Sequence, residues 1–369
     1  MAHPLQSVLH ERHVAAGAKF SEFGGWLMPL QYAGVVSEHR AVRERVGVFD
    51  VSHLGKALVE GPGALDFLNR CLSNDLARIG DGQAQYTLLC DESGGVVDDM
   101  IAYRFSPQRV LLIPNAANNE TVVGLLRDAA PAGVEVANRH EDLAVIAVQG
   151  PYSDETLAAL ALPVDHPYMG FAVARFGGAE LTVCRTGYTG ERGYELVVPN
   201  QAAGEVWDAV LAAGREYDAV PAGLGARDTL RTEQGYALHG HELSPQISPV
   251  QAGVSWAVGW KKDAFWGADA LRAERSAGPK RRSRGLRAVG RAIPRPGMAV
   301  VGANETPLGE VTSGTFSPTL NTGIALALLD AAVEPGARVG VRIRSRVEEF
   351  EVVEPPFVPS RVKDASDQP

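Results

Sequence analysis

The stretch GGVVDDMIAY, residues 94–103, predicts a turn followed by a β-strand that carries two adjacent carboxylates among apolar side chains. Neighbouring side chains of a strand point to opposite faces, so Asp98 and Asp99 lie on different faces. Asp99 shares its face with the apolar side chains of Val97 and Ile101. An acid on such a face is costly to bury unless it is paired or takes part in chemistry. Asp99 is therefore a candidate catalytic residue.

The preceding run QYTLLC, residues 85–90, is also typical of a strand, so the two runs predict a β-hairpin. If the two glycines between them form a two-residue turn, Tyr86 lies opposite Tyr103, and Cys90 lies opposite Asp99. Two tyrosines and an aspartate on one face could form the wall of a pocket for a flat polar ring. The alternative is a cross-strand aromatic pair with Asp99 in a structural hydrogen bond, and the hairpin alone favours this alternative.

The bulk properties indicate a globular protein of two or three domains. The chain has 369 residues, of which 45% are hydrophobic and 21% are charged. Its formal net charge of −9 argues against a general nucleic-acid binder. The N-terminus has no secretory signal pattern, and no apolar stretch has the length of a membrane span. The three cysteines have no metal-ligand spacing and fit reduced core residues. We therefore expect a cytoplasmic monomer with no nucleic-acid or membrane partner.

The composition changes near residue 275. The basic run PKRRSR, residues 279–284, predicts a linker or an exposed edge, and a solvated charge run is favoured over a nucleic-acid patch. Farther on, apolar residues alternate with glycine and arginine over residues 339–344, and glycine and proline turns separate short strands. This pattern predicts a C-terminal β-barrel or sandwich. The chain is therefore divided into residues 1–275 and 276–369.

Two features of the loop and strand after residue 186 suit a ligand. The loop GYTGERG, residues 187–193, precedes a strand and lacks the lysine of a phosphate loop. Its glycines allow a tight turn that presents Tyr188 beside a ligand, although a plain hairpin connection is the alternative. Glu195 follows on the strand face opposite Tyr194. A carboxylate can accept two hydrogen bonds from an amino-pyrimidine edge, but an exposed strand acid is the favoured alternative from sequence alone.

Arg227 lies in GLGARD, residues 223–228, where two glycines precede a helix. Its planar guanidinium suits a carbonyl or a carboxylate, and the alternative is an ion pair with Asp228 or Glu233. The run HGH, residues 239–241, could suggest zinc, but no third ligand stands at helical spacing. We therefore expect no metal site.

Seven segments, in this order along nearly the whole chain, resemble the aminomethyltransferases of the glycine cleavage system, the T-protein family. No single segment is sufficient for this resemblance, but the ordered set is specific. The segments are residues 23–32 (FGGWLMPLQY), 47–55 (GVFDVSHLG), 94–103, 115–118 (NAAN), 186–195 (TGYTGERGYE), 223–228 and 356–359 (PFVP).

The resemblance implies an α+β fold with three domains in a cloverleaf around a central folate cavity. Two interleaved α/β subdomains would form residues 1–275, and a β-barrel-like domain would form residues 276–369. The implied activity transfers the methylene group of an aminomethyl-lipoyl arm on the H-protein to tetrahydrofolate. Ammonia and 5,10-methylenetetrahydrofolate would be the products, with the lipoylated H-protein as a transient partner and tetrahydrofolate as co-substrate.

The resemblance also assigns roles to single residues. The second aspartate of the Gly-Gly-x-x-Asp-Asp motif is catalytic in the family, and it corresponds to Asp99, in agreement with the face argument. Trp256 is preferred over Trp260 as the family's pocket tryptophan. The folate contacts carried over are Tyr86, Tyr103, Asn115, Tyr188, Glu195, Arg227, Trp256 and Arg361. Two departures are Leu54, where the family has methionine, and Pro114, where valine is common; the first conserves volume, and the second removes a backbone donor.

Proteins with other functions share the same folate-binding fold but do not catalyse this reaction. One is a tetrahydrofolate-dependent demethylase, although such relatives tend to depart at the Asp-Asp site that is intact here. A second is a non-enzymatic folate-binding protein that supports iron–sulfur assembly, but its Lys-Gly-Cys-Tyr-type motif is absent. A third is the folate half of a flavin-linked amine oxidase, for whose flavin half the chain is too short. These alternatives predict different substrates for the same cavity.

Overall fold

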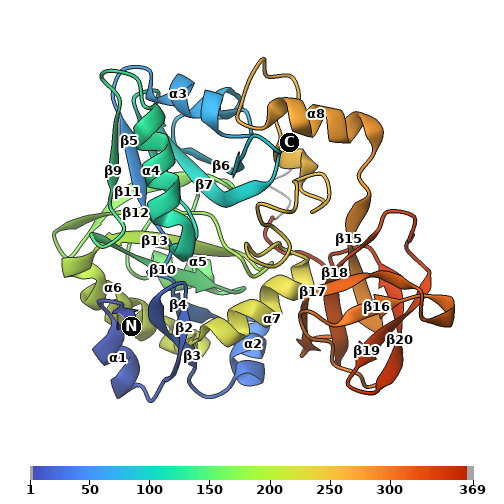
Figure 1. Ribbon diagram of the computed structural model, residues 1–369. Helices are drawn as coiled ribbons and strands as arrows, with labels where there is room; N and C mark the ends of the chain where they lie inside the picture. Colours follow the sequence, from blue (N-terminus) through green and yellow to red (C-terminus); the bar gives the residue numbers. More distant parts are fainter. Residues whose placement is uncertain (1–2, 364–369) are drawn as a thin grey trace.

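The structure is a computed structural model that describes residues 3–363. It is a mixed α/β protein with two large sheets, a small sheet and a closed C-terminal barrel. Figure 1 shows the barrel at one side of the molecule and the two large sheets at the other. The expected α+β fold with a C-terminal barrel is confirmed.

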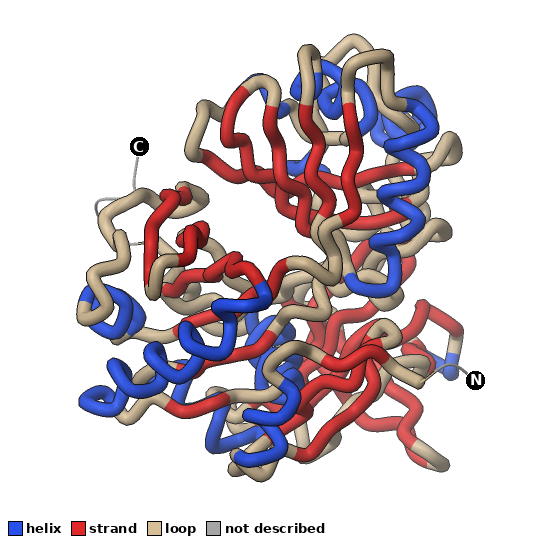
Figure 2. Tube along the Cα trace, turned by 90° about the vertical axis from the view of Figure 1, so that its left-hand side faces the viewer, coloured by secondary structure: helices blue, strands red, loops and turns tan. Residues whose placement is uncertain are grey.

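The first large sheet carries the Asp-Asp strand. One face is covered by helices α3 (Ala64–Cys71) and α4 (Asn119–Ala129), whose apolar side chains form a core with Met100 and Ala102. Figure 2 shows this sheet in the upper part of the molecule with helix along its side. In spatial order the strands are β6 (Gln83–Cys90), β7 (Val96–Ser106), β8 (Arg109–Ile113), β5 (Ala57–Glu60) and β9 (Glu135–Asn138).

The second large sheet is interleaved with the first along the chain. Along the chain, β4 (Gly47–Asp50) comes first, and the strands of the first sheet follow it. The next strand, β10 (Leu143–Gln149), pairs with β4. Helices α5 (Ser153–Ala158) and α6 (Asn200–Ala213) cover its outer face. In spatial order the strands are β11 (Phe171–Phe176), β12 (Ala179–Cys184), β13 (Gly193–Pro199), β10 (Leu143–Gln149), β4 (Gly47–Asp50) and β14 (Val220–Pro221).

The inner faces of the two large sheets share one apolar core, in which Tyr103 and Leu111 of the first sheet meet Cys184 and Val197 of the second. A small sheet lies beside this pair with helices α1 (His10–Ala15) and α2 (Val35–Glu44). Its strands are β1 (Leu5–Gln6), β3 (Trp26–Gln31) and β2 (Lys19–Phe23). Polar groups at the inter-sheet boundary are thus enclosed by apolar layers.

The C-terminal barrel is joined to the rest through helices α7 (Leu224–Gln234) and α8 (Ala268–Ala277). Its core is apolar and includes Leu286, Val341 and Phe350. In spatial order the barrel strands are β15 (Arg281–Ala288), β18 (Thr322–Asp330), β17 (Pro307–Ser317), β16 (Ala299–Val301), β19 (Arg338–Ile343) and β20 (Arg346–Val353).

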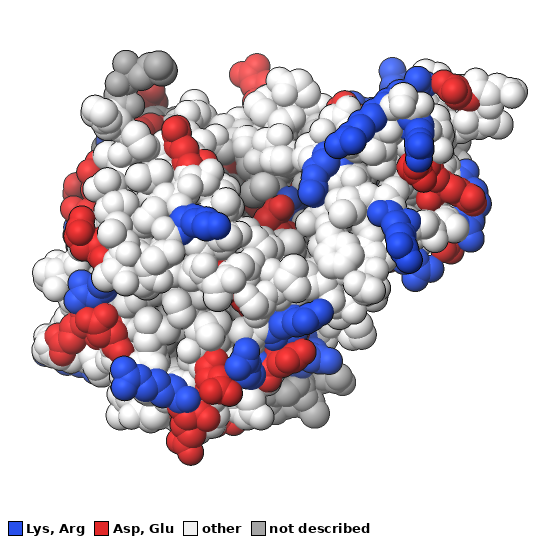
Figure 3. Space-filling view, turned by 90° about the horizontal axis from the view of Figure 1, so that it is seen from below, with Lys and Arg blue, Asp and Glu red and all other residues white. Residues whose placement is uncertain are grey.

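The basic run is a barrel strand and not a linker, although residues 280–282 are exposed as expected for a solvated charge run. Residues 281–284 pair with β18 inside the closed barrel. Arg284 is buried and forms an ion pair with Glu354, because its alternate position in the strand points toward the protein rather than toward water. On the face seen in Figure 3, positive and negative side chains are interspersed.

The predicted register of the Asp-Asp hairpin is wrong by two residues. Tyr86 lies opposite Ile101 instead of Tyr103, and Leu88 lies opposite Asp99. A shift of two residues keeps every side chain on its expected face, because the side-chain period of a strand is two. Tyr86 and Asp99 therefore still share a face.

The register differs because the turn is longer than two residues. The Asp91 side chain accepts hydrogen bonds from the backbone N–H groups of Ser93 and Gly95, and the Asp91 N–H donates to the Gly95 carbonyl. A bulge between Leu89 and Cys90 lies just before this turn. An aspartate that closes a turn through its own side chain is a local alternative to the glycine turn assumed from the sequence.

A segment after the barrel returns to the large sheets. Its backbone contacts α7 and the 187–193 loop: the Phe357 N–H donates to the Glu233 carbonyl, and the Arg361 N–H donates to the Gly190 carbonyl. The buried guanidinium of Arg185 donates to the Val362 carbonyl at 2.9 Å. The end of the described chain is thereby held against the loop that carries Tyr188.

Candidate active site

Three separate segments bring polar and aromatic side chains to Asp99. The Tyr86 hydroxyl of β6 donates to Asp99 Oδ2 at 2.9 Å. Asn115, just beyond β8, donates from Nδ2 to Asp99 Oδ1 at 2.9 Å. Trp256 places its ring 5.2 Å from that of Tyr86, centroid to centroid, and remains 64% exposed. The structure thus groups three predicted site residues around the partly exposed Asp99 carboxylate.

The pKa of Asp99 is raised above its ordinary value by burial, against the lowering effect of the Tyr86 and Asn115 hydrogen bonds and of His239. Burial also raises the pKa of Asp98, and the neighbouring Asp99 charge raises it further. Two carboxyls this close titrate as a pair. The pair can therefore hold a proton nearer to neutral pH than a lone exposed aspartate would.

A second group centres on Glu195 of β13. The Thr186 hydroxyl donates to Glu195 Oε2 at 2.6 Å, and the Tyr103 hydroxyl lies 3.1 Å from Thr186 Oγ1. Glu195 is only 8% exposed, while its strand neighbours Tyr194 and Leu196 face the opposite core. The alternative of an exposed strand acid is therefore wrong.

A third group joins Tyr188 to Arg227. The Arg227 guanidinium lies over the Tyr188 ring, 4.7 Å from its centroid, and its Nη1 is buried without a hydrogen-bond partner among the described residues. Tyr188 is itself held by stacking on Tyr236 and by a hydrogen bond to the Ala237 carbonyl. A buried donor without a partner is unfavourable unless a ligand satisfies it. A carbonyl or carboxylate oxygen would do so.

The ion pairs considered for Arg227 are made by other residues. Asp228 pairs with Arg231 at 2.7 Å, and Glu233 pairs with Arg43 at 2.7 Å. Burial lowers the pKa of Arg227, and the charge of Glu195 opposes that effect. Glu195 and Arg227 thus form an acceptor and a donor within electrostatic reach of each other.

The remaining assignments are less tightly grouped. Arg361 is exposed, and its Nη1 lies 4.0 Å from Glu191 Oε1 at the edge of the 187–193 loop. Trp260 donates its indole N–H to the Ser255 carbonyl and packs against Arg275, so it does not reach Tyr86. Its position favours Trp256 as the pocket tryptophan.

Three residues near the site had no role in the sequence argument. Thr186 orients Glu195, and its place at the start of the 186–195 segment was a usable signal. Asn118 contacts Asp98, and the paired amides of the NAAN segment could have indicated it. His239 was weighed only as a zinc ligand, but it contacts Asn118 and the Val96 carbonyl.

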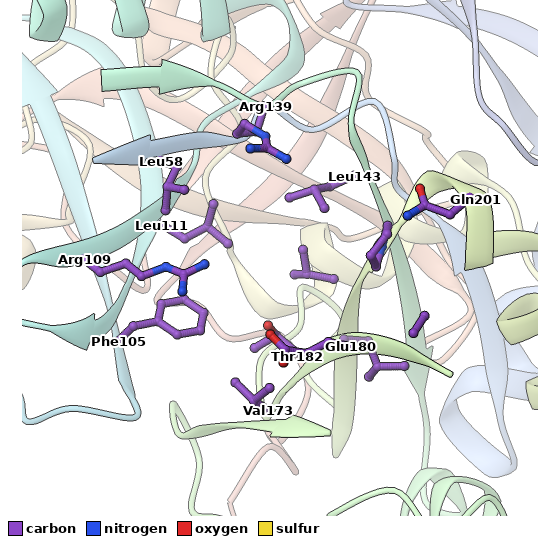
Figure 4. Close-up of a pocket in the computed structure, with 14 residues that line it drawn as sticks. Leu58, Phe105, Arg109, Leu111, Arg139, Leu143, Val173, Glu180, Thr182 and Gln201 are labelled. Atoms are coloured by element: carbon purple, nitrogen blue, oxygen red, sulfur yellow. The ribbon is translucent and has the colours of Figure 1, made fainter. Parts of the chain in front are cut away.

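A separate hollow of about 320 Å³ lies between the two large sheets, toward the far end of β7 from Asp99 (Figure 4). Phe105, Arg109 and Leu111 line one side, and Glu180 and Thr182 line the other. None of the site residues assigned from the sequence lines it. We therefore place the candidate active site at Asp99 and not in this hollow.

Within residues 3–363, no three His, Cys, Asp or Glu side chains gather in a way that could hold a metal ion. Over the same described range, no helix is both long and apolar enough to cross a membrane. Pro114, a departure from the family pattern, follows the last residue of β8, so its missing N–H interrupts no pairing of that strand.

Comparison with known proteins places these groups in a family. The GCVT N-terminal domain family matches residues 9–262, and the glycine cleavage T-protein C-terminal barrel domain family matches residues 281–359. The chain is 60% identical to an aminomethyltransferase of Mycobacterium tuberculosis (strain ATCC 25618 / H37Rv) over 96% of this chain and 97% of that protein. It is also 60% identical to an aminomethyltransferase of Frankia alni over 98% of this chain and 99% of that protein.

A solved structure agrees. The glycine cleavage system aminomethyltransferase T from Bartonella henselae superposes with a TM-score of 0.91 at 34% identity, over 96% of this chain and 98% of that chain. The chain belongs to the glycine cleavage T-protein family. Its activity is that of an aminomethyltransferase, a transferase enzyme of the glycine cleavage system. The full-length match favours this activity over the demethylase and non-enzymatic alternatives.

Replacing Glu195 by alanine should weaken tetrahydrofolate binding while the fold is kept. The carboxylate would be lost as an acceptor for ligand N–H groups, and hydrogen bonds to charged groups contribute about 1.5–3 kcal/mol. We expect the dissociation constant, measured by quenching of tryptophan fluorescence, to rise by roughly 10–100-fold. Glu180→Ala, on the hollow of Figure 4, is the matched control. An unchanged dissociation constant in Glu195→Ala would remove this residue from the site.

Proposed function

We propose that the chain transfers the methylene group of an aminomethyl-lipoyl arm, carried by the H-protein, to tetrahydrofolate, with release of ammonia and formation of 5,10-methylenetetrahydrofolate. The observation that carries this proposal is the partly exposed Asp99 carboxylate, held by Tyr86 and Asn115, in a protein that also offers a buried acceptor in Glu195 and an unpaired donor in Arg227. The family role of the T-protein supports both the co-substrate and the partner.

Glu195 and Arg227 suit the two edges of a pterin. The Glu195 carboxylate is held through Oε2 by Thr186 and can accept N–H groups of an amino-pyrimidine. The free Nη1 of Arg227 can donate to a ring carbonyl. Tyr188 supports the guanidinium from one side. Together these residues would fix the ring before the lipoyl arm arrives, which lowers the entropic cost of the reaction.

Asp99 supplies the charge and the proton acceptor that the transfer needs. The aminomethyl carbon exchanges its bonds to sulfur and to the amine nitrogen for bonds to two folate nitrogens. The two protons of those nitrogens go to the departing thiolate and amine. Positive charge develops at the carbon as the amine leaves, and a carboxylate beside it stabilises that charge. The same carboxylate can take up and pass on a proton during the exchange.

The finer organisation is proposed on the same basis. We infer a folate-binding region over residues 1–275 and a barrel domain over residues 276–369, with the molecule acting as a monomer. Arg361 would lie toward the folate tail. Contact with the H-protein would be transient, because the lipoyl arm must visit other enzymes of the system. The three cysteines are buried and free, which supports work in the cytoplasm.

A transfer assay tests the proposal. The purified chain is mixed with aminomethylated H-protein, and ammonia and methylenetetrahydrofolate are measured with and without tetrahydrofolate. We expect equal amounts of the two products, and only when both substrates are present. H-protein without its lipoyl group is the control. Product formation from a small methylated amine, with none from the H-protein, would point instead to a demethylase of the same fold.

A further inference from the structure

A hydrogen-bond network of amide and carboxyl side chains lies on the side of β7 opposite Asp99. Asp98 is fully buried on the opposite face of β7. Its Oδ1 accepts hydrogen bonds from the side-chain amides of Asn115 and Asn118, at 2.8 and 2.7 Å. Its Oδ2 accepts a third from the Asn115 backbone N–H at 2.9 Å. Three N–H donors favour the ionised form of a carboxyl. These bonds are opposed by burial and by the neighbouring Asp99 charge, which raise the pKa of Asp98 to about 8, so that Asp98 and Asp99 titrate as a pair near neutral pH.

Asn115 connects the two carboxyls. Its Nδ2 lies 2.8 Å from Asp98 Oδ1 and 2.9 Å from Asp99 Oδ1. An amide group has two hydrogens, so one can point to each aspartate. The orientation of the Asp99 carboxyl is therefore tied to that of Asp98 through a single side chain.

His239 anchors the other end of the network. Its Nε2 donates to the Val96 carbonyl at 3.1 Å, so Nδ1 of the neutral ring accepts from Asn118 Nδ2 at 3.0 Å. The second amide hydrogen of Asn118 goes to Asp98. The network ends at two groups that can only accept hydrogen bonds, the Val96 carbonyl and the Asp98 carboxylate. These two ends fix the direction of every hydrogen bond between them.

We propose that Asp98, held in place by Asn118 and His239, is a positioning residue that sets the basicity of Asp99. Two adjacent carboxylates repel each other, so an ionised Asp98 makes a proton on Asp99 more favourable, and the two carboxyls titrate as a pair. The titratable groups facing Asp99 are Asp98 on its own strand, Tyr86 of β6, and Tyr188 and His239 from loops. Of these, only Asp98 is a second carboxyl, and it is joined to Asp99 through the Asn115 amide.

Burial raises the pKa of Asp99, and repulsion within the pair acts in the same direction. General-base catalysis is most effective when the pKa of the base lies near the working pH, and an ordinary aspartate lies well below it. The inference rests on the proposed function, because it needs Asp99 to act in the transfer. If Asp98 loses its charge, Asp99 should become a weaker base that ionises at lower pH.

The test is the pH profile of kcat/KM for methylenetetrahydrofolate formation in two variants. Asp98→Asn removes the charge directly. Asn118→Ala removes a donor, so Asp98 takes the proton of the pair. In both we expect the acid limb to move to lower pH by on the order of one unit, and kcat to fall because a weaker base accepts the proton less readily. Tetrahydrofolate binding should be unchanged. Glu120→Gln, an exposed carboxylate in the first turn of α4, is the control and should keep the wild-type profile.

A matched pair at His239 covers the case in which Asp98→Asn does not fold. His239→Gln retains one donor and one acceptor and should keep the wild-type acid limb, while His239→Leu should move it to lower pH. A lower kcat with an unmoved acid limb in Asn118→Ala and His239→Leu would overturn the positioning role and leave Asp98 a structural residue. No methylenetetrahydrofolate from the wild-type chain would instead refute the proposed function, so the two failures are distinct.

Discussion

Replacement of Asp99 by asparagine should lower kcat by about 10²–10⁴-fold, the range that general acid–base groups contribute. Asparagine has nearly the same shape: its oxygen can accept from Asn115 while its amide N–H donates to the Tyr86 hydroxyl, so the hairpin should remain folded. It cannot carry the negative charge or take up a proton. The loss should therefore appear in kcat and leave tetrahydrofolate affinity close to that of the wild type.

The measurement is steady-state transfer from aminomethylated H-protein, with tetrahydrofolate binding determined separately. Asp91→Asn is a useful comparison, because Asp91 lies on the same hairpin but only closes its turn. Turnover of Asp99→Asn within a few-fold of wild type would eliminate Asp99 as the proton-transfer group. Loss of folate binding together with kcat would reassign it to substrate binding.

Replacement of Glu233 by alanine should lower the free energy of unfolding by about 3–5 kcal/mol, the usual cost of breaking a buried ion pair. Glu233 on α7 is fully buried. Its carboxylate pairs with Arg43 of α2 at 2.7 Å and accepts hydrogen bonds from Ser317 and Thr319 at the end of a barrel strand. The change leaves Arg43 without its closest carboxylate partner and removes the hydrogen bonds of Glu233 to the barrel.

Urea unfolding of the two proteins measures this difference. Asp208→Asn is the control, because its ion pair with Arg12 is largely exposed and such pairs contribute less than about 1 kcal/mol. A loss in Glu233→Ala no larger than that of the control would mean that packing, and not this ion pair, joins the barrel to the rest of the protein.

The Glu233 carboxylate should also make the free energy of unfolding depend on pH. Hydrogen bonds from His39 and Ser317 and the charges of His39 and Arg43 lower the pKa of Glu233 from 4.5 to about 2, against the effect of burial. Its folded pKa is depressed, so its contribution is complete above about pH 4.5 and is lost as pH falls toward 2. This difference amounts to about 3 kcal/mol. The acid dependence of the urea midpoint between these pH values should be smaller in Glu233→Ala.

Strand periodicity was sufficient to place Asp98 and Asp99 on opposite faces and Glu195 opposite Tyr194. These assignments depend only on a side-chain period of two, which is local and survives a change of register. The hairpin register was wrong because the Asp91 side chain, rather than the two glycines alone, closes the turn. The basic run was correctly expected to be exposed at Arg281 and Arg282, but the linker assignment and the exposure of Arg284 were wrong, because pairing with a distant strand places these residues in the barrel.

By itself, the sequence determined which residues share a strand face, that the C-terminal part is β-rich, and, through the resemblance, the family and the candidate residues. Only the tertiary structure decided that Arg227 has a buried nitrogen without a partner and that Asp98 is tied through Asn118 to His239. The physical reason is the distance along the chain over which each property is determined. Side-chain alternation is set by each strand's own backbone, whereas burial, charge pairing and hydrogen-bond partners depend on residues that folding brings together from more than a hundred positions away.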